Sequence, residues 1–234
     1  VRLDDATMKK TGRHIQGATH YRNGAGTARQ EYRTLWGLNF VWAIMRVPLP
    51  RWPGHFLSLP IGLELYLKEP LANALKVPYH SRSALARRIV DQVATALPTR
   101  TMHVATDGGY ATQEFLRALP PNVQVVGRFL LTGVLYHLPP PRRQGQRGAP
   151  RKKGARLGSP KTLALSSSGW HPHPQEAGAF IQSWVGMWYS VLPGQLIRIV
   201  VVWRPQRAEA PPSHGKKTFG RLKPLEAFFS TDVT

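Results

Sequence analysis

The chain has 234 residues and contains no cysteine. Without thiols it can form no disulfide, hold no zinc through thiolates and use no cysteine nucleophile. Acidic residues are also scarce, with 12 Asp and Glu against 32 Lys and Arg, which gives a formal net charge of +20. A field of this size favours a polyanionic partner, either nucleic acid or an anionic membrane surface, and says little about the fold.

Long apolar runs are missing as well. The longest, Ile199-Val200-Val201-Val202-Trp203, has the length of a strand, whereas a membrane-spanning helix needs about 20 apolar residues. The chain opens on Val1 without the basic and apolar segments of a signal peptide. We therefore expect no membrane partner and a cytoplasmic location.

The hydrophobic pattern predicts an α/β fold. An apolar stretch over 35–45, a turn rich in Pro at 48–54 and alternation over 57–67 predict two strands joined by a turn. Helical spacing over 85–97 ends at Pro98. A strand over 101–107, a short helix capped by Thr112 and a strand from Val123 follow. This order indicates a mixed sheet with helices on its faces.

The composition changes at residue 139, where a segment rich in Pro, Gly and Arg begins. It has no periodicity and no acid, so we expect an extended, mobile arm. Its cations are Arg142, Arg143, Arg147, Arg151, Lys152, Lys153 and Arg156. Strands near 179–189 and 196–204, a second basic loop at 214–223 and an apolar run at 225–230 follow. A charge run is usually a solvated linker, but the lack of acids favours contacts with phosphates.

Two aspartates stand at the ends of predicted strands. Asp5 closes the run Val1-Arg2-Leu3-Asp4-Asp5, and Asp107 follows His103-Val104-Ala105-Thr106 and precedes Gly108-Gly109. We interpret them as oxygen ligands of Mg²⁺ at the carboxyl ends of two strands, where sites in open α/β sheets lie. Strand alternation puts Asp4 and Asp5 on opposite faces, so only one of them can contact the metal. The alternative is that both segments are ordinary turns or caps.

Several short motifs follow one another along the chain. They are Leu3-Asp4-Asp5-Ala6-Thr7, Lys10-Thr11-Gly12 with Gly17, Leu35 to Val41, Leu59-Pro60 to Leu65-Tyr66, Asp107-Gly108-Gly109-Tyr110-Ala111, Val126-Gly127-Arg128, Leu138 to Pro141 with the arm, and Phe229 to Asp232. In these motifs and their order, the chain resembles the catalytic domain of bacterial insertion-sequence transposases of the DDE class. The resemblance spans essentially all 234 residues.

The resemblance implies a ribonuclease H-like fold, with a mixed sheet, helices on both faces and an inserted β-rich region that carries a basic loop. The implied domains are a catalytic core over 1–130, the β-rich insertion over 131–204 with the arm at 139–157, and a basic loop with a last strand over 205–234. It also implies metal-dependent cleavage and joining of DNA at element ends by a homodimer in the bacterial nucleoid. Three carboxylates would hold two Mg²⁺ ions, or Mn²⁺ in their place, about 3.5–4 Å apart.

On this resemblance Asp5 matches the first acid, with Asp4 as runner-up, and Asp107 matches the second. The third acid of the family is a glutamate on a downstream helix, and neither Glu226 nor Asp232 stands in its context. We therefore expect the chain to stop before the third acid and to be inactive or impaired as given. The residues expected to bind DNA are Lys9, Lys10, Arg13, Arg128 and the seven cations of the arm.

Two other functions stay open at this point. One is a non-catalytic basic protein that binds RNA or DNA, such as a ribosome-associated or packaging protein. It predicts salt-dependent binding that ignores divalent metal. The other is a ribonuclease H-like metal nuclease that hydrolyses DNA without joining it, and an assay for strand transfer separates it from a transposase.

Overall fold

The computed structural model describes residues 1–12, 14–22, 34–142, 144–145, 147–205 and 225–233. They form two compact units, one of residues 1–110 and 118–123 and one of residues 111–117 and 124–234. The basic loop expected at 214–223 lies outside the described residues, and the domain limits expected at 130 and 204 stay predictions. In the part of the chain described, no helix is both long and apolar enough to cross a membrane.

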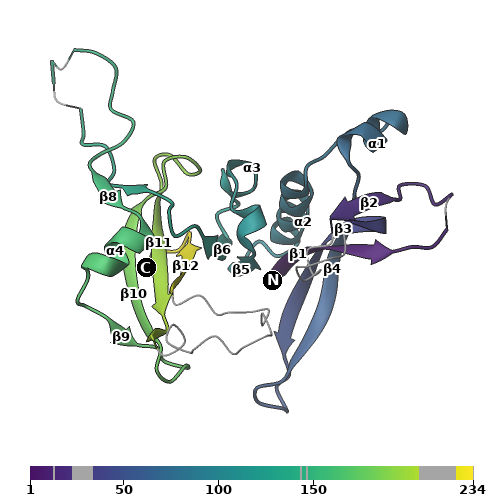
Figure 1. Cartoon of the computed structure of the whole chain (residues 1–234), viewed down its shortest axis with the longest axis horizontal. Coiled ribbons are helices and arrows are strands. Elements are labelled where there is room, and N and C mark those ends of the chain that lie inside the picture. Colours follow the sequence, from purple (N-terminus) through teal and green to yellow (C-terminus); the bar gives the residue numbers. More distant parts are fainter. Residues whose placement is uncertain (13, 23–33, 143, 146, 206–224, 234) are drawn as a thin grey trace, which may run out of the picture. The chain divides into compact units, whose positions relative to one another are not determined.

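The first unit is built around the long strand β3 (Thr34–Pro48). It pairs antiparallel with β1 (Arg2–Lys9), β2 (Thr19–Arg22) and β4 (Phe56–Tyr66). On its other edge β1 is joined by β5 (Met102–Thr106), which runs parallel to it. The sheet is therefore mixed, and with its helices it confirms the predicted α/β class and the ribonuclease H-like fold (Figure 1).

The predicted strand, turn and strand over 35–67 are confirmed as β3, β4 and the turn between them. Among the strands that the structure describes, β4 pairs with β3 alone. Its register shifts between Ala43 and Ile44, and Pro60 is the residue opposite Ile44. Proline has no N–H to give to a neighbouring strand, so an irregular edge position suits it.

Helix α2 (Arg82–Ala96) confirms the helical spacing read from the sequence. Ser81 caps it, because the Ser81 side chain accepts the N–H of Ala84 at 3.0 Å. The helix packs against β3 and β4, and Ile89 is 2% exposed. Ile89 lies directly over Gly62 of β4, where an added Cβ would come within 3.2 Å of Ile89 Cγ1 and closer still to Cγ2. One face of the sheet is thus covered by α2.

The strands of the second unit follow the order β6 (Val123–Phe129), β12 (Leu225–Ser230), β11 (Leu196–Trp203) and β10 (Phe180–Met187). Each pair in this order is antiparallel. The short strand β9 (His171–Pro172) also pairs with β10. The predicted strands near 179–189 and 196–204 and the last apolar run are therefore confirmed.

Aromatic and aliphatic side chains fill the core of this second unit. Ile197, Ile199 and Val201 alternate along β11 and are fully buried. The ring of Trp188 lies 4.7 Å from that of Phe129 and 5.8 Å from that of Phe229, measured between centroids. Burying large apolar side chains of this kind contributes about 1.5–3 kcal/mol each.

The arm connects β7 (Leu135–Tyr136) to β8 (Arg156–Gly158), and these two strands pair with each other. At its base the N–H of Gly154 donates to the carbonyl of His137 at 3.0 Å, and the N–H of His137 donates to Ala155 at 2.9 Å. The arm is therefore a loop closed at its base. Backbone pairing holds the two ends of the arm, and the expectation that the arm itself is extended and mobile stays a prediction.

The remaining helices are short. Helix α3 (Gln113–Leu116) is the predicted one, and the Thr112 side chain caps it by accepting the N–H of Phe115 at 3.3 Å. Helices α1 (Glu69–Ala74) and α4 (Pro160–Ser166) were not predicted.

The placement expected for Asp5 is wrong in one respect. Strand β1 does not end at Asp5 but continues to Lys9, because residues 6–9 also pair with β3. Asp5 consequently lies in the middle of a strand. Asp107, in contrast, does follow the last residue of β5.

Candidate active site

Asp5 lies on the inner face of β1. Alternation along the strand puts it on the same side as Leu3, which is 1% exposed, and Thr7. Asp4 points to the other face, where one of its oxygens lies 3.9 Å from Arg2. Asp4 also accepts the backbone N–H of Asp5 at 2.9 Å. The structure thus separates the two neighbouring aspartates by face, as expected.

A buried asparagine and an arginine hold the Asp5 carboxylate. Asn39 of β3 is only 2% exposed, and its amide nitrogen donates to Asp5 Oδ2 at 3.3 Å and to Thr7 Oγ1 at 3.0 Å. Arg82, the first residue of α2, lies with its Nε 3.1 Å from Asp5 Oδ2. The same Nε donates to Asn39 Oδ1 at 3.1 Å. Because both groups engage Oδ2, the other oxygen of Asp5 is left for a further ligand.

Asp107 stands in the turn that follows β5. The backbone N–H of Gly109 donates to Asp107 Oδ1 at 2.9 Å. A Cβ at position 109 would lie 3.1 Å from the same oxygen, so glycine allows this close approach. The side chain is exposed, and its Oδ2 is open to solvent ligands.

Asp107 follows the strand that pairs with the start of β1. Arg2 is paired with Ala105 in the parallel ladder, and Asp107 stands two residues beyond Ala105, just after the last residue of β5. Neighbouring strands lie about 4.8 Å apart. Asp107 therefore lies in the first unit near the start of β1, the strand that carries Asp4 and Asp5.

The pKa of Tyr110 is affected by these charged side chains. Its side chain is 2% exposed, and burial is the main cause that raises the pKa of its phenol. The negative charges of Asp5, Asp107 and Asp4 raise that pKa further, in this order, and the positive charge of Arg82 opposes them. The phenol thus lies within electrostatic reach of all four groups.

The donor chemistry of Asp5 and Asp107 fits a hard divalent cation. Each carboxylate has one oxygen engaged by the protein and one available. Mg²⁺ keeps several water ligands and is commonly bound through one or two carboxylates. Within the ranges that the structure describes, no group of three or more His, Cys, Asp or Glu side chains could hold a metal. A cation at this place would therefore have to be held by two acids and water.

Glu226 takes no part in such a site. One of its oxygens accepts from Arg128 and the other from Arg204, both at 2.8 Å. Arg204 is also bound to Glu176 at 3.0 Å. Arg128, which the sequence suggested as a DNA contact, therefore serves at least in part to neutralise Glu226.

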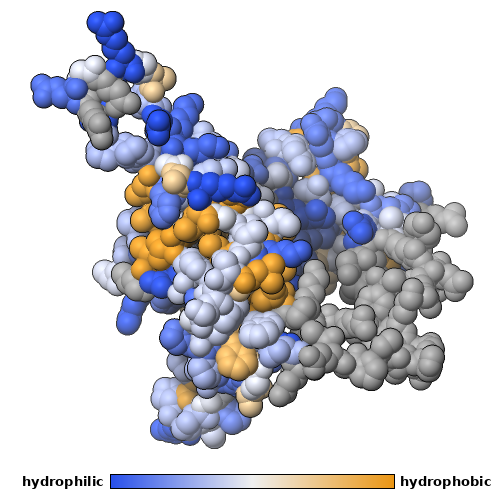
Figure 2. Space-filling view, turned by 60° about the vertical axis from the view of Figure 1, so that its left-hand side comes forward, coloured by the Kyte–Doolittle hydropathy of each residue, from blue (hydrophilic) through white to orange (hydrophobic). Residues whose placement is uncertain are grey.

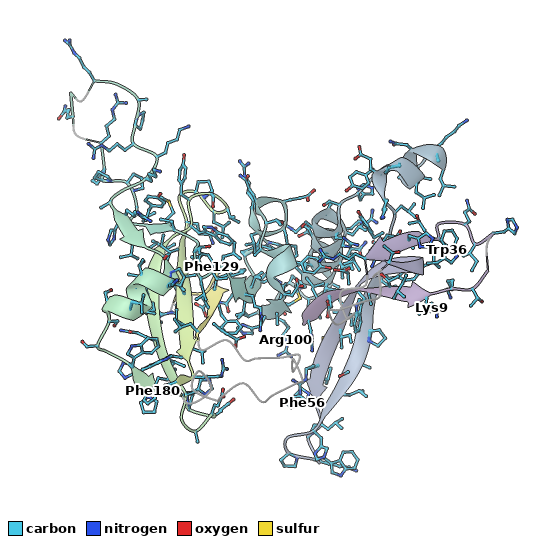
Figure 3. The ribbon with its side chains drawn as sticks, viewed as in Figure 1. Lys9, Trp36, Phe56, Arg100, Phe129 and Phe180 are labelled. Atoms are coloured by element: carbon cyan, nitrogen blue, oxygen red, sulfur yellow. The ribbon has the colours of Figure 1, made fainter. Side chains whose placement is uncertain are left out.

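Lys9 and Lys10 lie away from the acids. Lys9 is exposed at the end of β1, near Trp36 of β3 (Figure 3). Four residues of strand separate it from Asp5, which corresponds to about 13 Å. A contact of either lysine with DNA stays a prediction. Arg13 lies outside the described residues.

The arm presents a hydrophilic surface (Figure 2). Arg142 donates to the carbonyl of Gly148 at 3.3 Å. The Lys153 ammonium lies over two rings, 4.5 Å from the centroid of Tyr136 and 5.3 Å from that of Tyr189. Arg143 lies outside the described residues. The remaining exposed cations of the arm are Arg147, Arg151, Lys152 and, in β8, Arg156.

Sequence reasoning missed three residues of this site: Asn39, Arg82 and Tyr110. Asn39 carried a signal, because it is a polar residue inside the apolar run of 35–45, and buried polar groups are retained when they are hydrogen-bonded. Tyr110 stood in a quoted motif, but its burial was not foreseen. Arg82 had no signal in the sequence alone.

Comparison with known protein families gives a match. Residues 3–171 match the profile of a family described as DDE superfamily endonuclease. The matched range includes Asp5, Asp107 and the whole arm. No curated protein and no solved structure matches the chain.

Proposed function

Because the chain belongs to the DDE superfamily endonuclease family, we propose that it is a transposase catalytic domain that cuts and joins DNA with divalent metal held by Asp5 and Asp107. Family membership itself gives a nuclease or transposase type of enzyme with DNA as its substrate. The joining step, the metal and the residues are our proposal. It is supported above all by the geometry at Asp5, where Asn39 and Arg82 engage one carboxylate oxygen and leave the other for a metal.

Each carboxylate has a defined task in this proposal. The open oxygens of Asp5 and Asp107 would hold the metal, and Asn39 with Arg82 keeps Asp5 from rotating. A divalent cation held there would supply Lewis-acid chemistry, which favours deprotonation of the attacking hydroxyl and offsets charge on the leaving oxygen. Tyr110 forms a buried wall beside the acids, which keeps solvent from one side of the site. Asp4 stays on the opposite face of β1 and adds negative charge to the metal site.

The basic residues hold the DNA backbone. Lys9, Lys10 and the exposed cations of the arm supply phosphate contacts, which depend on salt and not on sequence. Lys153 adds a cation beside two tyrosine rings, which offers a face for a base or sugar as well as a charge. In the full reaction we expect two copies of the protein to bring two element ends together.

Nicking of supercoiled plasmid tests the proposal. In a chain extended by the expected downstream helix with its glutamate, we expect nicking that requires Mg²⁺ or Mn²⁺, and loss of at least 100-fold of the rate, about 3 kcal/mol, in Asp5→Asn and Asp107→Asn. Asp91→Asn is the matched control, since Asp91 is an acid of the same unit that pairs with Arg87 at 2.8 Å. Unchanged nicking in both site variants would refute the assignment of the acids.

A binding measurement covers the case of weak nicking. Mn²⁺ titration followed by electron paramagnetic resonance should show a site with a Kd on the order of 10⁻⁴–10⁻³ M, as in weak carboxylate sites. Asp5→Asn and Asp107→Asn should each weaken it. DNA binding that depends on salt but ignores the metal and both substitutions would favour the non-catalytic basic protein, to which the arm is equally suited. Nicking without transfer of a labelled 3′-hydroxyl strand would favour a nuclease.

A further inference from the structure

Arg82 makes three contacts that fix the plane of its guanidinium. Its Nε donates to Asn39 Oδ1 and lies next to Asp5 Oδ2, at 3.1 Å in both cases. Its guanidinium carbon lies 4.2 Å from the ring centroid of Tyr66, the last residue of β4. The side chain is thus held by residues of β1, β3 and β4, although it projects from α2.

These contacts leave the far end of the guanidinium available. A guanidinium has five N–H donors, and the contacts of Arg82 with Asn39 and Asp5 use Nε alone. Among the described residues, the two terminal nitrogens have no hydrogen-bond partner. The side chain is 39% exposed, so a ligand can reach it. Two terminal N–H groups in one plane match two oxygens of a phosphate.

The negative charges of the site also require a positive side chain near them if a phosphate is to bind. Asp5 and Asp107 both lie within electrostatic reach of Tyr110, and they repel a DNA phosphate that approaches them. Arg82 is close enough to oppose their effect on Tyr110, whereas Lys9 is about 13 Å along the strand from Asp5. Arg82 therefore supplies the positive charge beside Asp5, whereas Arg2 lies 3.9 Å from Asp4 on the other face of β1.

We propose that Arg82 binds a non-bridging oxygen of the DNA phosphate that faces Asp5 and Asp107, while its Nε keeps Asp5 in position. This inference rests on the proposed function. It makes Arg82 a substrate-binding residue and Asn39 a positioning residue. It also explains why an arginine stands where lysine has the same charge, because a lysine ammonium cannot stack on Tyr66, contact Asp5 and donate to a phosphate in one plane.

The test compares Arg82→Gln and Arg82→Lys with Arg88→Gln. Arg88 is a matched control: it lies on the same helix, is 45% exposed, and is ion-paired with Glu64 at 2.6 Å. Both glutamine variants remove one positive charge from α2. The probe is a fluorescein-labelled DNA duplex, titrated with protein in Ca²⁺, which fills carboxylate sites without supporting rapid cleavage, and again in EDTA.

In Ca²⁺ we expect Arg82→Gln to bind the duplex roughly tenfold more weakly than Arg88→Gln does, as for the loss of a charged hydrogen bond. Arg82→Lys should recover only a small part of this loss. In EDTA the difference should shrink, because the uncompensated acids keep the phosphate away. A purely structural role for Arg82 would change thermal unfolding but would leave the Ca²⁺-dependent part of the affinity as in the control.

Failure of the proposed function and failure of the inference about Arg82 would give different results. If Ca²⁺ has no effect on DNA binding by the unmodified chain, and Asp5→Asn changes nothing, the proposed function fails and Arg82 loses its role with it. If Ca²⁺ strengthens binding and Asp5→Asn abolishes that gain, but Arg82→Gln and Arg82→Lys behave like Arg88→Gln, the site stands and the inference about Arg82 is wrong.

Discussion

Substitution of Asn39 by alanine is expected to destabilise the first unit by about 3 kcal/mol. Asn39 is 2% exposed and makes one hydrogen bond to Thr7, one to Asp5 and one to Arg82. A hydrogen bond between neutral groups contributes about 1 kcal/mol, and one to a charged group about 1.5–3 kcal/mol. The side chains of Asp5 and Arg82 are 31% and 39% exposed, so water replaces part of what they lose. Their two bonds therefore count for about 1 kcal/mol each.

Urea unfolding of the unmodified chain, Asn39→Ala, Asp5→Ala and the double variant measures this effect. The tryptophan fluorescence signal gives each midpoint, and the double-mutant cycle gives the coupling between Asn39 and Asp5. We expect a coupling energy of about 1 kcal/mol, because the two side chains are in contact. A loss below about 1 kcal/mol for Asn39→Ala, or additivity of the two substitutions, would refute the view that Asn39 positions Asp5.

Three further predictions concern packing, the arm and pH. Gly62→Ala should lower stability by about 1–3 kcal/mol, because the stiff, branched Ile89 side chain cannot move aside; an unchanged urea midpoint would contradict this packing. Gly154→Ala puts a Cβ within 2.9 Å of the carbonyl of His137, so limited proteolysis should cut the arm faster, and cleavage at the original rate would show that its base tolerates the change. Tyr110 has its pKa raised from 10.0 in the folded state, so its contribution to stability is complete below pH 10 and is lost as pH rises above it, by about 1.4 kcal/mol for each pH unit. Tyr110→Phe should flatten this alkaline loss of stability, and an identical slope in the variant would be evidence against it.

Hydrophobic periodicity predicted β4 and α2. The leucines of 57–67 alternate because β4 is a long strand, although Leu57, Leu59, Leu63 and Leu65 are exposed. The spacing of Leu85, Ile89 and Val90 follows from a helix that buries these side chains on a sheet. The cap at Thr112 was readable because its hydroxyl is followed by an apolar turn. These signals are local, and tertiary packing only reinforces them.

The short elements could not be predicted in this way. Helices α1 and α4 have 6 and 7 residues. These segments are too short for the 3.6-residue repeat of apolar positions to be recognised. Strand β2 has 4 residues and is defined by its pairing with β3. The same applies to the second half of β1, where Lys9 and its polar neighbours gave no strand signal and pairing with β3 decides the structure.

The residues of the site also fall into two groups, those with a local sequence signal and those placed by tertiary packing. Asp5 and Asp107 were identifiable because acids are rare in this chain and both stand in motifs of the resemblance. Arg82 was not, because it meets Asp5 across 77 positions of sequence through the packing of α2 on β3. Which oxygen of Asp5 is open is likewise decided by that packing and by Asn39.

A crystal of the chain soaked in Mn²⁺, with data collected at the manganese absorption edge, tests the central claim most directly. We expect an anomalous difference peak that lies roughly 2.0–2.3 Å from one oxygen of Asp5 and one oxygen of Asp107. If saturating Mn²⁺ gives no peak between them, with Asp5 still bound to Arg82 alone, the two acids do not form the metal site on which this account depends.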